Sequence, residues 1–389
     1  MTQIPANKRN DGLDTLRSAA ILLVFMYHYM VFVSHEATFG WASMAGWVGV
    51  DLFFVLSGYL IGNQIFSGIA AGKRLSLPSF FARRLLRTLP NYYVVLALYL
   101  LFPFVMGGKT PPALWTFLTF TQNYQLTPGT AFSHAWSLCI EEQFYLLLPL
   151  VVVLAQRLGA PMRLAWWALG GLIVAAVTLR SLLWLRYGQI AGGAIEGYYP
   201  NIYYSTFCRF DELLPGVGIA LLKNFHRPVW DRLMRHGQAL LALGLAGAVV
   251  LGYLLVTAYD VDGVGYGYFM TGFGYSLVAL CFGVLTLAAL SPASLLYRVR
   301  VPGAARLAAW SYAIYLTHKP IGFMLGKLAG GAGIAPGSAA GVALIVAASL
   351  LGGWLLYRLV EQPFMRLRER RVPGNFKGPE VPQGSALVR

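Results

Sequence analysis

The sequence predicts an all-α polytopic membrane protein with about ten transmembrane helices. Of its 389 residues, 57% are hydrophobic and only 12% are charged. A soluble domain carries about twice that share of charged residues. Apolar runs of about twenty residues recur along the chain, which is the length a helix needs to cross a bilayer. Because hydrocarbon offers no hydrogen bonds, the backbone of each run must satisfy itself as a helix.

Hydropathy and loop charge together predict the topology. Ten spans are expected near residues 14–34, 45–66, 89–107, 135–156, 164–185, 207–224, 237–258, 267–290, 307–327 and 338–360. Basic residues gather in alternate connections, at residues 8–9, 73–87, 157–163, 223–235, 298–306 and 366–371. Since basic loops stay on the cytoplasmic side, both termini are predicted to be cytoplasmic. The membrane domain is predicted to cover residues 1–371, and the Pro/Gly-rich tail at 372–389 to be disordered.

Charge and cysteine content exclude other classes. The formal net charge is +15, but the positive residues lie in short loops between apolar runs, so nucleic-acid binding is not expected. The three cysteines, Cys139, Cys208 and Cys281, have no spacing typical of a disulfide framework or a zinc cluster. No metal is therefore expected.

Two ionisable residues inside the first span mark the first candidate site. Arg17 and His28 are eleven positions apart, so they share one helix face with about 16 Å between them. Ionisable groups at membrane depth are costly and usually functional. His28 is therefore predicted to act as a general base toward a hydroxyl, with a purely helix-joining role as the alternative. Arg17 either faces the same site, snorkels to the interface or pairs with Asp14.

Carboxylates at a similar depth form two further candidates. Asp51 is the one acid in a long apolar run, and it either orients a histidine or caps a helix. Glu141 and Glu142 open a later span and point about 100° apart on a helix, so at most one faces His28. We expect Glu141 to do so and hold Glu142 in reserve. Cys139 is more simply a buried apolar side chain than a nucleophile.

An arginine cluster lies in the longest inner connection. Arg83 and Arg87 are four positions apart and Arg84 and Arg87 three apart, so the cluster shares one helical face. Guanidinium groups bind phosphates through paired hydrogen bonds, which suits a polyphosphate ligand. Ordinary positive-inside charge that touches anionic lipid is the alternative.

Polar residues also occur toward the outer side. Arg209 and Asp211 open the sixth span, and His318 and Lys319 lie within the ninth. Four residues could line an outer site: Glu142, Arg209, Asp211 and His318. Aromatic residues in the connections at 108–134 and 186–206 suit either membrane anchoring or a carbohydrate-facing surface. The residues are Trp115, Tyr124, Tyr198, Tyr199, Tyr203 and Tyr204.

In this order, the motifs resemble acyltransferase family 3 of membrane-bound O-acyltransferases. The matching segments are residues 12–17 with His28, 49–58, 80–90, 136–145, 209–216, 311–318 and 361–364, which extend over nearly the whole chain. The resemblance places the family's arginine–ten residues–histidine motif on Arg17 and His28. It places the donor-associated arginine pair on Arg84 and Arg87. The sequence departs from the family at Cys139, where serine or threonine is common, and at Lys319, where tryptophan is common.

The resemblance implies acyl transfer in a bacterial inner membrane, from cytoplasmic acetyl-CoA to a hydroxyl of a glycan or lipid-linked sugar. Arg83, Arg84 and Arg87 would hold the phosphates of CoA. His28 would deprotonate the acceptor with help from Asp51 or Glu141. Direct transfer and a transient acyl-histidine both stay open. The printed sequence carries no appended esterase-like domain, so the helices are expected to complete the transfer alone.

A transporter or flippase for a glycan or lipid-linked intermediate is the alternative function. It accounts for polar residues inside the membrane, but neither for the one-sided arginine cluster nor for the ordered motifs. The sequence predicts neither the identity of the acceptor, nor the acyl length, nor the oligomeric state.

Overall fold

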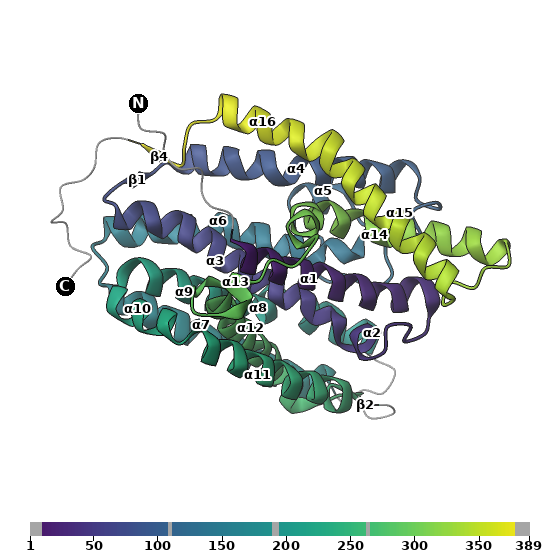
Figure 1. Ribbon diagram of the computed structural model, residues 1–389, viewed down its shortest axis with the longest axis horizontal. Coiled ribbons are helices and arrows are strands. Elements are labelled where there is room, and N and C mark those ends of the chain that lie inside the picture. Colours follow the sequence, from purple (N-terminus) through teal and green to yellow (C-terminus); the bar gives the residue numbers. More distant parts are fainter. Residues whose placement is uncertain (1–9, 108–110, 189–193, 262–264, 378–389) are drawn as a thin grey trace.

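The computed structural model describes residues 10–107, 111–188, 194–261 and 265–377. Figure 1 shows one bundle of long helices that run roughly side by side, with a short two-stranded sheet at each end. The long helices are α1 (Asp11–Tyr29), α3 (Gly49–Ala70), α4 (Leu77–Leu101), α6 (Trp136–Arg157), α7 (Met162–Tyr187), α11 (Gly237–Ala258), α12 (Tyr275–Leu290), α14 (Ala304–Gly331) and α15 (Ala339–Leu356).

Shorter elements complete the bundle. The helices are α2 (Trp41–Ala45), α5 (Leu114–Leu118), α8 (Thr206–Arg209), α9 (Leu214–Phe225), α10 (Arg227–Arg235), α13 (Leu295–Arg298) and α16 (Gln362–Arg371). The strands β1 (Arg74–Leu75) and β4 (Phe376–Lys377) pair antiparallel, as do β2 (Asp260–Val261) and β3 (Gly265–Tyr266).

The predicted fold class, an all-α membrane protein, is confirmed. Seven helical segments among the described residues are long and apolar enough to cross a membrane: 11–34, 41–70, 133–157, 162–187, 237–258, 270–290 and 339–371. The other three predicted spans coincide with α4, with α8 and α9, and with α14. α4 and α14 are long but carry charged residues, and α9 has only 12 residues. The count of about ten and the cytoplasmic termini therefore stay predictions.

Close helix crossings bring the polar residues of the bundle together. α1 packs against α14 and α3, and α3 packs against α9. At the crossing of α3 and α9, Gly58 and Gly216 leave no room for a Cβ atom, because each lies against backbone atoms of the facing segment. Small residues of this kind let membrane helices approach closely. The crossing holds the segment Phe210–Leu213, which carries Asp211, against α3.

The ordered chain extends beyond the predicted boundary at residue 371. β4 pairs with β1, and the carbonyl oxygen of Asn375 accepts a hydrogen bond from the backbone N–H of Ser76. The ring of Phe376 lies against Gly68. Composition does not register a strand partner about 300 residues away, and the domain boundary at residue 371 and the disorder of the tail stay predictions. Residues 378–389 of the predicted tail lie outside the described residues.

Candidate functional site

A cavity of about 620 Å³ lies among α1, α3, α4, α6 and α14. Its charged lining comprises Arg17, Arg84, Arg87, Glu141, Glu142 and Arg368, and the hydroxyls of Ser57, Ser137, Tyr312 and Tyr315 also face it. A second cavity of about 670 Å³ lies beside α16, and its charged lining comprises Asp14, Arg17, Arg87, Glu361, Arg366, Glu369 and Arg370. Arg17 and Arg87 line both cavities, so they stand between them.

Among the described residues, Arg17 and Arg87 are not in ion-pair contact with a carboxylate, although Asp14 lies near Arg17 and Glu361 near Arg87. Neither guanidinium makes a side-chain hydrogen bond or an ion pair within the part of the chain that the structure describes. The two groups lie close enough for their charges to repel each other. The predicted alternative of an Arg17–Asp14 ion pair is not formed. Two cations that line a cavity and are not in ion-pair contact with a carboxylate are suited to an anionic ligand.

Arg84 lies in the same cavity but is paired. Its Nη2 atom lies 3.3 Å from Oε1 of Glu142, and its guanidinium stacks over the ring of Tyr145 at 3.6 Å. The hydroxyl of Thr88 donates a second hydrogen bond to the same Glu142 oxygen, at 3.0 Å. Glu142 therefore lies beside Arg84 in the lining of the cavity, and its predicted acceptor-side role stays a prediction.

Arg83 points away from the cavity, unlike its two neighbours in the predicted cluster. Its Nη2 atom donates to both carboxylate oxygens of Glu369 at 2.8 Å, and its Nη1 atom donates to the carbonyl of Val372 at 3.0 Å. Arg83 thus fastens the C-terminal segment to α4. The three arginines share a sequence motif but have three different environments.

The two predicted helper acids are not hydrogen-bonded to His28. Oε1 of Glu141 accepts a hydrogen bond of 2.5 Å from the Ser57 hydroxyl, inside the cavity. Oδ1 of Asp51 accepts from Nη2 of Arg209 at 2.8 Å, and Arg209 also pairs with Glu212. Sequence spacing predicts how far along a helix a residue lies, but not which neighbouring helix its side chain faces. The sequence therefore could not predict that Ser57 and Arg209, rather than His28, contact these acids.

Arg209 and Asp211 belong to two buried ion clusters. Arg209 is fully buried and lies over the rings of Trp136, Tyr203 and Tyr275. Asp211 forms a two-pronged ion pair with Arg180, at 2.7 and 3.1 Å. Sequence reasoning missed Arg180, although an arginine in the middle of an apolar run was a visible signal.

His28 meets His318 across the contact between α1 and α14. Nδ1 of His28 lies 2.6 Å from Nε2 of His318, and the two rings are nearly parallel, at 8°. A third ring, that of His134, stands edge-on with its centroid 6.3 Å from that of His28 and 5.8 Å from that of His318. Lys319 is also buried here and donates to the Ser133 hydroxyl at 3.0 Å.

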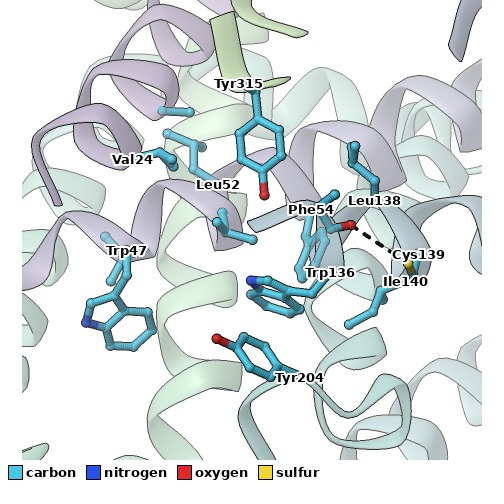
Figure 2. Close-up of a cluster of buried hydrophobic side chains, with 14 of the residues drawn as sticks. Val24, Trp47, Leu52, Phe54, Trp136, Leu138, Cys139, Ile140, Tyr204 and Tyr315 are labelled. Carbon is cyan, nitrogen blue, oxygen red and sulfur yellow. Dashed lines mark hydrogen bonds between the residues drawn. The ribbon is translucent and has the colours of Figure 1, made fainter. Parts of the chain in front are cut away.

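Tyr315 joins the histidines to the cavity. It lines the cavity, and its hydroxyl donates to the carbonyl of His134 at 2.5 Å and is hydrogen-bonded to Ser137 at 2.7 Å. Figure 2 shows this hydroxyl pointing into the apolar cluster that contains Phe54 and Trp136. His134 and Tyr315 were visible as polar residues in the sequence, but their meeting depends on tertiary contacts.

The outer aromatic residues differ in burial, and Tyr199 is half-buried. Tyr198, Tyr203 and Tyr204 are buried in the core, so they form neither a membrane anchor nor a carbohydrate-facing surface. Trp115 and Tyr124 are exposed and remain available for either role. Among the described residues, no group of three or more His, Cys, Asp or Glu side chains could hold a metal ion.

These features define an integral membrane protein with a charged cavity near a buried histidine pair. The family model described as "Acyltransferase domain", that of acyltransferase family 3, matches residues 10–358. The chain belongs to this family, as its motifs predicted.

Among curated relatives, the chain is 30% identical to the peptidoglycan O-acetyltransferase OatA of Listeria monocytogenes over 337 residues, which cover 81% of this chain and 50% of the relative. It is 26% identical to the O-acetyltransferase OatA of Staphylococcus aureus over 328 residues, which cover 80% of this chain and 50% of that protein. The chain therefore spans about half the length of the curated relatives it matches. No solved structure matches it.

Proposed function

We propose that this protein is an inner-membrane O-acyltransferase that moves an acetyl group from cytoplasmic acetyl-CoA to a hydroxyl of a glycan or lipid-linked sugar. The observation that carries the proposal is the cavity, with two unpaired arginines in its lining and Tyr315, the neighbour of the histidine cluster, in the same lining. The names of the relatives support an acetyl group as cargo and peptidoglycan as the first acceptor to test.

Arg17 and Arg87 are the proposed phosphate ligands of the donor. A CoA molecule carries several phosphate charges on a long, slender pantetheine arm. The phosphates would neutralise two guanidinium groups that now repel each other, and the arm would extend along the cavity toward Tyr315. Arg84 would add a third contact after Glu142 yields one of its hydrogen bonds. Arg83 is left out of this role because it binds Glu369.

His28 is the proposed general base. It would take the proton of the acceptor hydroxyl, and the resulting oxygen would attack the thioester carbonyl carbon. The C–S bond of the tetrahedral intermediate then breaks, and the CoA sulfur leaves with the proton that His28 had accepted. In the acyl-histidine variant, the ring nitrogen attacks first and the hydroxyl then displaces it. Lys319 is a buried cation whose ammonium lies over the Phe32 ring, which itself contacts His28, and it suits the developing oxyanion.

The predicted topology gives the transfer its direction. If the basic connections face the cytoplasm, the arginine-lined cavity lies toward the side where acetyl-CoA is available, and His28 lies toward the outer half of the first span. The transmembrane domain is proposed to extend over residues 1–371, with membrane lipid around it.

Transfer in proteoliposomes tests the proposal. The purified full chain receives acetyl-CoA with an isotopically labelled acetyl group and peptidoglycan glycan fragments, and mass spectrometry follows the labelled ester while a thiol assay follows released CoA. We expect transfer by the unaltered protein and a loss of about 10²–10⁴-fold in His28→Ala. The matched control is His236→Ala, at an exposed helix end outside both cavities.

Two results would contradict the proposal. Undiminished acetyl transfer by folded His28→Ala protein would show that His28 is not the general base. Movement of a glycan across the membrane without ester formation or thiol release would favour the transporter instead.

A further inference from the structure

The hydrogen bonds around His318 determine which ring nitrogens carry protons. Nδ1 of His318 lies 2.9 Å from the carbonyl oxygen of Ile314, one turn earlier in α14. A carbonyl oxygen only accepts hydrogen bonds, so Nδ1 of His318 must be the protonated nitrogen. In a neutral ring, Nε2 of His318 then carries a lone pair.

The same reasoning passes from His318 to His28. Nε2 of His318 lies 2.6 Å from Nδ1 of His28, and a hydrogen bond needs one donor and one acceptor. Since Nε2 of His318 is the acceptor, Nδ1 of His28 must donate. Nε2 of His28 is then unprotonated, and its lone pair is the one a base or a nucleophile requires.

The surroundings favour a neutral His318. Only 3% of its surface is exposed, and the buried ammonium of Lys319 is adjacent in sequence. A second positive charge at this place would repel Lys319 in a medium of low dielectric. The rings in contact with the histidine pair among the described residues are those of Phe25, Tyr27, Phe32, His134 and Tyr315, and none of them carries a carboxylate.

We propose that His318 is a positioning residue, which holds His28 in the tautomer with the proton on Nδ1. This inference rests on the proposed function, because it assigns a role in readying His28 for transfer. In serine hydrolases a carboxylate holds the corresponding histidine. Here a neutral imidazole and a backbone carbonyl perform that task without a negative charge at membrane depth. The required tautomer is the same for direct transfer and for an acyl-histidine.

Nitrogen NMR of the ¹⁵N-histidine-labelled full chain in proteoliposomes tests the tautomer directly. The difference between the spectra of the unaltered protein and His28→Gln identifies the His28 ring. We expect a protonated Nδ1 and an unprotonated Nε2 on His28, and a loss of this pattern in His318→Ala. An Nε2-protonated His28 in the unaltered protein would overturn the proposal.

Kinetics of three α14 variants provide the second readout. His318→Ala should lower kcat about 100-fold with little change in the KM for acetyl-CoA. His318→Gln keeps an acceptor oxygen near the position of Nε2, so it should recover at least tenfold over His318→Ala. Thr317→Val is the matched control, because the Thr317 hydroxyl bonds only within its own helix, to the carbonyl of Ala313.

The two proposals fail in different ways. If His28 shows the expected tautomer but His28→Ala transfers acetyl groups normally, the proposed base is wrong while the positioning contact stands. If His318→Ala loses activity while the His28 spectrum is unchanged, His318 acts by another route and the positioning role is overturned.

Discussion

The molecule contains two groups of arginines inside the helix bundle, and they differ in which groups neutralise their charge. Arg180 and Arg209 are fully buried, and Asp211, Asp51 and Glu212 neutralise them. Arg17 and Arg87 line cavities and have no carboxylate in ion-pair contact among the residues described. The first group completes its electrostatics within the protein, whereas the second requires something from outside.

We interpret this difference as one between structural charges and the charges proposed to bind the donor. Removing one partner of a buried ion pair leaves an uncompensated charge in a medium of low dielectric, which is strongly destabilising. Removing one of two unpaired cations relieves repulsion instead. Stability and ligand affinity should therefore respond in opposite ways to mutation of the two groups, and the following variants examine that expectation.

The largest stability effect is expected for Arg180→Ala. Among the described residues, this change leaves the Ser276 hydroxyl as the only side chain hydrogen-bonded to the buried Asp211 carboxylate. It also frees the carbonyls of Gly272 and Cys208. The expected cost is about 3–5 kcal/mol of folding free energy. Thermal unfolding in detergent, followed by size-exclusion chromatography, should show a clearly lower Tm or no folded protein.

A double variant keeps this prediction testable. Arg180→Met with Asp211→Leu removes both charges and should recover part of the lost Tm. A single Arg180→Ala protein as stable as the unaltered one would show that the pair is not structural.

Arg17→Gln and Arg87→Gln should act on donor binding without this loss of stability. A charge-assisted hydrogen bond to a phosphate contributes about 1.5–3 kcal/mol, so each change should raise the KM for acetyl-CoA at least tenfold. Because two like charges no longer face each other, the Tm should stay equal or rise slightly. Isothermal titration with CoA measures the affinity separately from turnover.

A drop in Tm without loss of CoA affinity in these variants would move Arg17 and Arg87 into the structural group. Arg232→Gln is a control for unspecific charge effects, because Arg232 lies on α10 and lines neither cavity.

Arg83→Gln should have a smaller effect, confined to the packing of the C-terminal segment. Its partner Glu369 is more than half exposed, so solvent screens the pair and limits its contribution to about 0.2–1 kcal/mol. Loss of this contact should loosen α16 and β4 rather than weaken CoA binding. Faster cleavage near residues 372–377 in limited proteolysis, at an unchanged KM, is the expected result. A tenfold rise in KM would instead return Arg83 to the donor site.

The sequence predicts the helices well because hydropathy is a local property. All ten predicted spans coincide with helical segments, although three of them fall short of the length or apolarity of a clear membrane span. Motif order was sufficient to predict the family. Both predictions use information that lies along the chain.

The partners of the polar side chains could not be predicted from the sequence. Arg83, Arg84 and Arg87 look equivalent in a motif, but their partners Glu369 and Glu142 come from different helices. Asp51 was expected beside His28, and the structure places Arg209 against it instead. Contacts of this kind depend on the rotation of each helix about its axis, and that rotation is set by packing across the whole bundle.

The smallest effect on activity is expected for Cys139→Ala. This substitution tests whether the departure from the family at Cys139, within the glutamate motif, affects catalysis. Cys139 is fully buried in the core between Leu138 and Ile140, where Figure 2 shows its sulfur facing a backbone carbonyl, that of Ala135 at 3.8 Å. Its neighbours Ser137 and Leu138 line the cavity, but Cys139 does not, so no thioester could reach its sulfur. Turnover should therefore stay within about twofold, and the Tm should fall slightly for one lost buried sulfur. A loss of acetyl transfer beyond 100-fold in folded Cys139→Ala, together with a labelled acetyl group on Cys139 of the unaltered protein, would transfer the nucleophilic role from the histidine pair to this thiol.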